Sequence, residues 1–257
     1  DPWTQIDFYE QLLPGDKADK KHKALERSCL EGADEVITVS NACASGLEEI
    51  GKRNVHVVTN GYEFPDFDAS TIDLDKEFTI SHFGSMPFAR NPLVLWKALS
   101  TLLKEQPELG EKLKIRLIGS VDFNVLRSAQ EHGLKDYIEV LPPVSHAESI
   151  ELQRKTQLLL LVANNTGNVK GILTGKFFEY LGAKRPIIAI GLGDSDLEKA
   201  VNDTHCGFFA DYNDESDMKK YLCEAFERFN EGNLIGKPTN LDQFHSKTLA
   251  KKIIDLL

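Results

Sequence analysis

The sequence lacks the features of three classes of protein. Its longest apolar run, Leu158–Ala163, has the length of a buried strand and is far short of the ~20 residues that cross a bilayer. Its four cysteines show no CxxC spacing, which favours reduced thiols in a cytoplasmic setting over disulfides or a zinc site. Basic side chains number 30 against 40 acidic ones, and the net charge of −10 argues against a nucleic-acid backbone as the main partner. An anionic ligand would need a local positive site.

The first residues also lack the features of a signal peptide. Asp1-Pro2-Trp3-Thr4 has neither a basic start nor an apolar stretch, and the chain does not begin with Met. We therefore expect a fragment or a processed product. What the chain does have is 41% hydrophobic residues over 257 positions, enough to bury the core of one large domain or two small ones.

From about Asp34 the sequence alternates between short β-branched runs and longer helical patterns, which is typical of βαβ units around a parallel sheet. The predicted fold class is therefore α/β. The expected strands are Glu35–Val39, Val55–Val58, Phe78–Phe83, Ile115–Ile118, Ile138–Val140, Leu158–Val162 and Pro186–Ile190. The expected helices include Leu93–Glu105, Val125–His132, Ala147–Arg154 and Phe177–Ala183.

A domain boundary is expected where both patterns stop. Residues 60–68 are rich in turn formers and acids and show neither a strand period nor a helix period. Residues 1–62 hold two strands and some helix, too little for a complete domain, so we expect them to be the end of a domain whose beginning lies outside this chain. Residues 63–76 are then a linker, and residues 77–257 form the main domain.

Ligands of an open parallel sheet bind beyond the carboxyl ends of its strands, and the first loop of this kind in the main domain follows Phe83. Gly84 in this loop allows a close backbone approach, and Ser85 comes next. Arg90, a few residues further on, supplies a planar cation suited to phosphate. A plain surface turn with an exposed arginine explains the same residues equally well.

The loop after Val162 is the best candidate for an anion site. Residues 163–176 contain three glycines and two lysines and end in Gly175-Lys176, directly before the expected helix. Backbone N–H groups, the helix dipole and Lys176 can all face a diphosphate. The loop is not a P-loop, because Phe177 stands where Ser or Thr would hold magnesium. A mobile surface loop is the alternative.

Several stretches of the chain fit one family template in the same order. Gly175–Ala189 is similar to a K-x-x-E-Y-L-A-x-G-R-P-V-I stretch, and Ala33–Ser40 to an A-D-x-V-I-x-V-S stretch near the end of a first domain. Val58–Gly61 is similar to the exit into a linker, and His82–Ser85, Leu117–Ser120 and His205–Phe208 to parts of a second domain. With these stretches the chain resembles the retaining glycosyltransferases of family four, the GT-B glycosyl transferases group 1.

The resemblance implies a GT-B C-terminal domain, a Rossmann-like parallel sheet with flanking helices, preceded by the end of an acceptor-side α/β domain. In this family the glutamate of the E-Y-L stretch contacts the ribose of a nucleotide, and Glu179 holds that position here. A carboxylate can accept from two hydroxyl groups, and a helix N-terminus favours its charge. Arg90 matches the family's downstream lysine, so Arg90 and Lys176 would flank the diphosphate.

The chain departs from the family pattern at two positions. The family's earlier glutamate, which touches the donor sugar, corresponds to Gly171. Either backbone groups of Gly171, Ile172, Leu173 and Thr174 hold the sugar, or the donor differs from the commonest ones. The family's phosphate-binding arginine, directly after the glycine of the first loop, corresponds to Ser85.

Two further positions are expected near the site. The loop Leu141-Pro142-Pro143-Val144 matches the part of the family that holds the base against apolar side chains and backbone groups, and core packing is the alternative. His82, at a strand end, either faces the cleft or has the structural role that is commoner for a lone histidine.

The resemblance implies transfer of a hexosyl group from a UDP- or GDP-linked sugar to an acceptor in glycan biosynthesis, with retention and without a bound metal or other cofactor. It leaves open whether the acceptor is a glycan or a lipid-linked sugar, and whether the intact protein associates peripherally with a membrane. Because the family's acceptor loops lie in the first domain, we expect this chain alone to bind the donor without turnover. The alternatives are a non-catalytic nucleotide-binding module of the same fold and a nucleotide-sugar epimerase, which would need carboxylates in the cleft.

Overall fold

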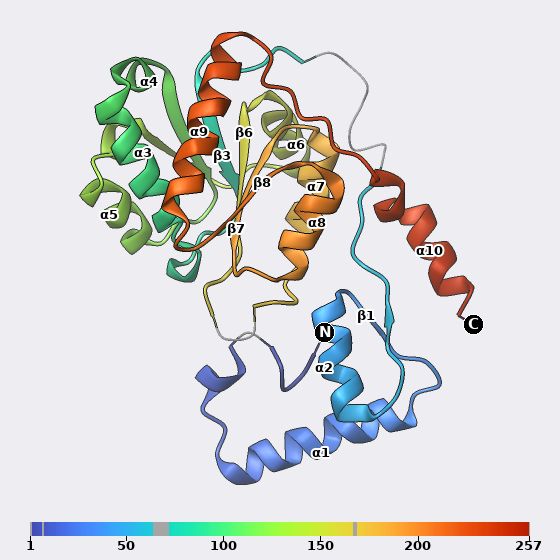
Figure 1. The fold of residues 1–257 in the computed structure, drawn as a ribbon. Helices are drawn as coiled ribbons and strands as arrows, with labels where there is room; N and C mark the ends of the chain where they lie inside the picture. The colour runs from blue at the N-terminus through green and yellow to red at the C-terminus, as the bar shows by residue number, and fades with distance from the viewer. Residues whose placement is uncertain (1, 7, 64–71, 167–168, 257) are drawn as a thin grey trace.

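Two parallel sheets of unequal size organise the chain (Figure 1). A computed structural model describes residues 2–6, 8–63, 72–166 and 169–256. The smaller sheet has two strands, β1 and β2, and the larger has six strands in the order β5-β4-β3-β6-β7-β8. The strand pairs of both sheets are parallel, so each connection crosses over a face of its sheet.

The elements follow one another in two groups and a tail. The small sheet belongs with η1 (Tyr9–Leu12), α1 (Asp16–Gly32), β1 (Ile37–Thr38), α2 (Asn41–Gly51) and β2 (His56–Val57). The strands of the large sheet are β3 (Phe78–Phe83), β4 (Leu113–Ile118), β5 (Ile138–Leu141), β6 (Leu158–Val162), β7 (Ile187–Gly191) and β8 (Gly207–Asp211). Its helices are η3 (Phe88–Arg90), α3 (Leu93–Glu105), α4 (Pro107–Lys112), α5 (Phe123–Glu131), η4 (Lys135–Tyr137), α6 (His146–Lys155), α7 (Gly175–Ala183), α8 (Asp196–Thr204) and α9 (Glu215–Asn230). The tail is η5 (Leu241–Phe244) and α10 (Ser246–Ile254).

The central strands of the large sheet are buried on both sides, because helices cover both faces. In β6, Leu158, Leu160 and Val162 belong to the core under α3 and α9. Leu159 and Leu161 pack on the other face with α7 and α8, as the two-residue period of a strand requires. Figure 1 shows α3, α4, α5 and α9 on one side of this sheet and α6, α7 and α8 on the other. The predicted α/β class is confirmed as a three-layer structure.

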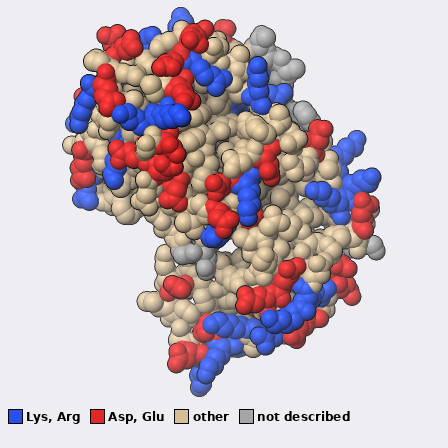
Figure 2. Space-filling view, in the orientation of Figure 1, with Lys and Arg blue, Asp and Glu red and all other residues tan. Residues whose placement is uncertain are grey.

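The small sheet has a core of its own. Its buried members are Leu30, Ala44, Leu47 and Val55. Arg53 connects the segment after α2 to the end of α1, because its guanidinium donates to the carbonyl oxygens of Leu30 (2.9 Å) and Asp34 (2.6 Å). α1 buries Glu26 and Leu30 and exposes most of its other side chains. Figure 2 shows acidic and basic side chains intermixed over the bottom of the molecule, where α1 lies.

The last elements of the chain return to the segment that leaves the small sheet. The Tyr62 N–H donates to the carbonyl oxygen of Phe244 (3.1 Å), and Tyr62 pairs with His245 in an isolated parallel bridge. Figure 1 shows α10 beside this segment, away from the large sheet. Residues 64–71 of the predicted linker 63–76 lie outside the described residues.

The predicted strands and helices at the centre of the large sheet are confirmed. Phe78–Phe83, Leu158–Val162 and Leu93–Glu105 have the predicted bounds. The expected strand Glu35–Val39 is too long, because it forms a ladder with β2 at only Ile37 and Thr38. The expected strand Val55–Val58 shortens in the same way.

The edge strand β8 is missing from the prediction. It begins at Gly207, where a Cβ atom would lie 2.0 Å from the carbonyl oxygen of Ile187 in β7. The prediction missed the strand because it begins with a glycine and its apolar run is short. The glycine is required there because the backbone of β7 lies so close. Among the helices of the described residues, we find none with the length and apolar character needed to cross a membrane.

Candidate functional site

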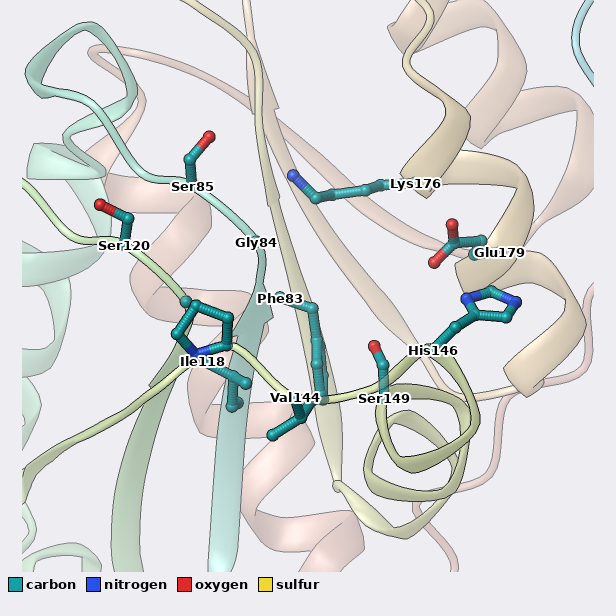
Figure 3. Close-up of a pocket in the computed structure, with 12 residues that line it drawn as sticks. Phe83, Gly84, Ser85, Ile118, Ser120, Val144, His146, Ser149, Lys176 and Glu179 are labelled. Atoms are coloured by element: carbon teal, nitrogen blue, oxygen red, sulfur yellow. The ribbon is translucent and has the colours of Figure 1, made fainter.

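A cavity of about 470 Å³ opens at the carboxyl ends of β3 and β4, next to the N-terminus of α7 (Figure 3). It is lined by Phe83, Gly84, Ser85, Ile118, Gly119, Ser120, Pro143, Val144, His146, Ser149, Lys176 and Glu179. Five of the predicted site residues therefore meet in one place, namely Gly84, Ser85, Val144, Lys176 and Glu179.

Two loops meet beside the cavity at positions that require glycine. Gly84 and Gly119 have φ angles of +98° and +130°, which residues with a Cβ atom rarely adopt. A Cβ atom on Gly119 would lie 2.5 Å from the carbonyl oxygen of Gly84. A Cβ atom on Gly84 would lie 2.6 Å from Lys176 Nζ. The ammonium group of Lys176 therefore lies directly over the bare backbone that follows β3.

The N-terminus of α7 forms the opposite wall. α7 begins at Gly175, and the Thr174 side chain does not cap it. The first N–H groups of a helix and the helix dipole favour an anion. Lys176 lies in this first turn, and Glu179 follows at the helical spacing that places it on the same face. Figure 3 shows Lys176 extending toward Gly84 and Glu179 lying beside His146.

The local charge around Lys176 is positive, although the chain carries a net charge of −10. Burial lowers the pKa of Lys176, the nearby charge of Arg90 lowers it further, and Glu179 opposes the shift. The Arg90 guanidinium donates from Nε to Asn164 Oδ1 (2.7 Å) and from Nη1 to the carbonyl oxygen of Ser85 (3.2 Å). An anion between the two cations would relieve their repulsion.

His82 does not line this cavity. It is 1% exposed, and its Nδ1–H donates to the carbonyl oxygen of Leu160 (3.0 Å). Burial lowers the pKa of His82 to about 4, so the ring is neutral at physiological pH. Of its two alternatives, the structural role is the one the geometry supports. Among the described residues, no group of three or more His, Cys, Asp and Glu side chains is placed to hold a metal ion.

The loop before α7 touches α2 at Gly171. A Cβ atom on Gly171 would lie 2.7 Å from Cys43 Sγ and 2.9 Å from Ser40 Oγ. Asp196, the first residue of α8 and 6% exposed, accepts from the Ala42 N–H through Oδ2 (2.8 Å). The backbone around Gly171 is therefore held against the N-terminus of α2, with no room for a side chain.

Comparison with known sequences gives one distant relative. No family model matches the chain. The D-inositol 3-phosphate glycosyltransferase of Paenarthrobacter aurescens (strain TC1) is 24% identical over 152 residues, which are 58% of this chain and 36% of that protein. The chain thus spans about a third of the length of this curated relative.

Solved structures show the fold. Sucrose-phosphate synthase from Thermosynechococcus elongatus has a TM-score of 0.71 and 14% identity, over 98% of this chain and 65% of that one. Anabaena Alr3699/HepE in complex with UDP and glucose has a TM-score of 0.71 and 16% identity, over 92% and 66%. WaaG, a glycosyltransferase involved in lipopolysaccharide biosynthesis, has a TM-score of 0.68 and 13% identity, over 93% and 67%. The chain therefore has the GT-B fold.

The other predicted site residues do not line this cavity. Gly175 lines a neighbouring cavity of about 410 Å³, which shares His146 and Glu179 with the first. Ile172 and Leu173 pack with the core cluster that contains α7.

Only part of the loop that was expected to hold the base reaches the cavity. Val144 and Pro143 line the cavity, whereas Leu141 packs against the core and Pro142 is exposed. The backbone of this loop therefore reaches the cavity through its second half.

The site prediction left out Ser120, His146 and Ser149, although all three line the cavity. His146 and Ser149 lie at the start of α6, where the helical pattern predicted a helix from Ala147. A helical pattern shows which face is buried but not which cavity the first turn meets. The available signal was position, because α6 begins directly after the loop expected to hold the base.

Proposed function

We propose that the cavity binds the nucleoside diphosphate of a nucleotide sugar, with residues 77–257 as the donor-binding domain and residues 1–62 as the end of the acceptor-side domain. The observation that carries this proposal is the placement of Lys176. Its ammonium group lies over the bare backbone at Gly84 and beside the uncapped N-terminus of α7. Glu179 faces the same cavity from the same helix. A cation, a helix N-terminus and a carboxylate match the phosphates and the ribose hydroxyls of a nucleotide.

Each part of the nucleotide has a place in this proposal. The diphosphate lies near Lys176, Arg90 and Gly84. The ribose hydroxyls donate to Glu179, and the base lies against Val144 and its neighbouring proline. Uracil is the base favoured by likeness, since Anabaena Alr3699/HepE was solved with UDP and with UDP-glucose. GDP remains the second choice from the resemblance.

In the intact protein we propose that a hexosyl group passes from this donor to an acceptor glycan or lipid-linked sugar, with retention. The chemical demand is to stabilise the negative charge that develops on the leaving diphosphate. In this proposal, Lys176, Arg90 and the N-terminus of α7 supply that stabilisation, without a protein-bound metal ion. We also propose a cytoplasmic setting, in keeping with four cysteines that are all free thiols. The chain alone binds the donor and does not turn it over.

The proposal is tested by titrating the chain with UDP, GDP, ADP, TDP and the matching nucleosides. We expect one diphosphate to bind preferentially. Lys176→Ala and Arg90→Ala should weaken the diphosphate far more than its nucleoside, because only the diphosphate carries the paired charge. Added salt should reduce the same difference. Equal losses for diphosphate and nucleoside in both variants, or no binding of any diphosphate by the folded chain, would overturn the proposal.

A non-catalytic nucleotide-binding module is the second candidate, and the contact at Gly171 favours it. The position that carries a sugar-contacting glutamate in the resembled family has no room for a side chain here. A module of this kind would bind the free nucleoside diphosphate as tightly as the nucleotide sugar. An epimerase fits less well, since Glu179 is the one carboxylate among the described residues that line the cavity.

A further inference from the structure

α6 carries a buried amide that touches the cavity wall at two points. Gln153 is 0% exposed. Its Nε2 group lies 3.0 Å from Ser149 Oγ and 3.3 Å from Glu179 Oε2. Ser149 and Glu179 both line the cavity, from α6 and α7 respectively. The side chain of Gln153 therefore bridges two polar groups that face the ligand site while it is itself closed to solvent.

The chemistry of the three groups fixes the direction of these hydrogen bonds. An ionised carboxylate can only accept, so the NH₂ end of the Gln153 amide faces Glu179. Its second N–H then donates to Ser149 Oγ, which acts as an acceptor. The Ser149 hydroxyl hydrogen is left to donate, and none of the described residues accepts it. Figure 3 shows the Ser149 hydroxyl directed into the cavity on the side where Glu179 lies.

The other end of the amide argues against a purely structural role for Gln153. Gln153 Oε1 is buried and has no hydrogen-bond partner among the described residues. Burying an amide oxygen without a partner destabilises the folded state. An apolar side chain of similar size would fill the same space without this cost. The amide is explained by what its N–H groups do for Ser149 and Glu179.

We infer that Gln153 is a positioning residue that presents Glu179 as an acceptor and Ser149 as a donor, and that this pair selects ribose over 2′-deoxyribose. Two vicinal hydroxyls can donate to Glu179 and accept from Ser149 at the same time. A sugar lacking one hydroxyl leaves one member of the pair without a ligand partner. The inference rests on the proposed function, because it assigns the cavity to the nucleoside part of a nucleotide.

The test compares UDP, 2′-deoxy-UDP and inorganic pyrophosphate by calorimetry with the wild-type chain, Gln153→Met, Ser149→Ala and Ser149→Thr. We expect the wild type to bind UDP about tenfold or more tightly than 2′-deoxy-UDP. In Gln153→Met and Ser149→Ala this ratio should fall toward one, with pyrophosphate binding unchanged. Ser149→Thr keeps the hydroxyl and should keep the ratio. The melting temperature of Gln153→Met should equal or exceed that of the wild type.

The outcomes separate the inference from the function it rests on. If the wild type binds neither UDP nor pyrophosphate, the proposed function and the inference both fail. If UDP binds and Gln153→Met keeps the wild-type ratio, the inference alone fails. If Gln153→Met melts earlier and loses affinity for all three ligands alike, Gln153 supports the fold and the inference also fails.

Discussion

Lys176 and Glu179 face one cavity with opposite charges, and each supports a separate prediction. For Glu179 we expect replacement by Ala to weaken binding of the preferred nucleoside diphosphate by ~1.5–3 kcal/mol, the cost of losing hydrogen bonds to a charged acceptor. The fold should remain intact, because Glu179 is partly exposed at the cavity wall. Isothermal titration calorimetry measures the loss. Glu151→Ala, on the exposed surface of α6, is the matched control. Unchanged affinity in Glu179→Ala would contradict the ribose assignment.

The lowered pKa of Lys176 predicts how diphosphate binding depends on pH. Burial and Arg90 lower this pKa in the free protein, and a bound diphosphate would raise it again. The protonated lysine binds the anion, so affinity is full at neutral pH and falls as pH rises through the lowered pKa. Calorimetry between about pH 7 and about pH 10 should show this fall for the wild type. Lys176→Arg stays charged and should flatten the profile, and identical profiles would exclude Lys176 as the titrating group.

Part of the site could be predicted from single residues, and part could not. Gly84, Lys176 and Glu179 follow strand ends or open a helix, and parallel strands bring such positions to one edge. Ser149 and Gln153 lie on a helix of ordinary amphipathic pattern. Their role depends on the neighbour that α6 meets in space, and the local sequence does not contain that information.

At the scale of elements, the contribution of the contact between α8 and α2 to the stability of the chain can be measured. Asp196 caps the N-terminus of α2 from a different helix, and Asn41 Nδ2 also donates to it (3.3 Å). We expect Asp196→Ala to destabilise the chain by about 1 kcal/mol, the usual cost of losing a helix cap. Hydrogen exchange should quicken at the Ala42 amide. Asp203→Ala, exposed on the same helix, is the control, and equal exchange in the two variants would show that the cap contributes nothing.

The sequence predicts best the elements that have a clear apolar or amphipathic pattern. β6 and α3 have long apolar patterns and the predicted bounds. β1 and β2 are shorter than predicted, because strand length depends on a partner in register rather than on β propensity alone. The pairing partner of a strand is a property of the sheet, so local pattern places a strand more reliably than it fixes the strand's ends.

At the scale of the whole molecule, the first unit, built on the small sheet, and the second unit, built on the large sheet, contact each other in more than one place. The first unit contacts the second through α2 at Gly171 and Asp196. Tyr62, where the chain leaves the first unit, contacts Phe244 near the other end of the sequence. These contacts constrain how far the two units can move apart. Lys176 and Gly171 belong to the same stretch of backbone, the end of the loop before α7 and the first turn of α7. A ligand bound at Lys176 and the contact of Gly171 with α2 would therefore both influence the position of this stretch.

The order of strands has a consequence for synthesis on the ribosome. β3 is buried along its whole length and lies between β4 and β6, with Ile80 paired to Leu158. At ~5–20 residues per second, β6 leaves the ribosome roughly 4–16 s after β3. For that interval one edge of β3, with its backbone N–H and C=O groups, has no strand to pair with. We expect ribosome-bound chains stalled before β6 to be cleaved readily by protease within β3, and chains stalled after β7 to be protected. Equal cleavage in both would mean that β3 is sheltered in another way during elongation.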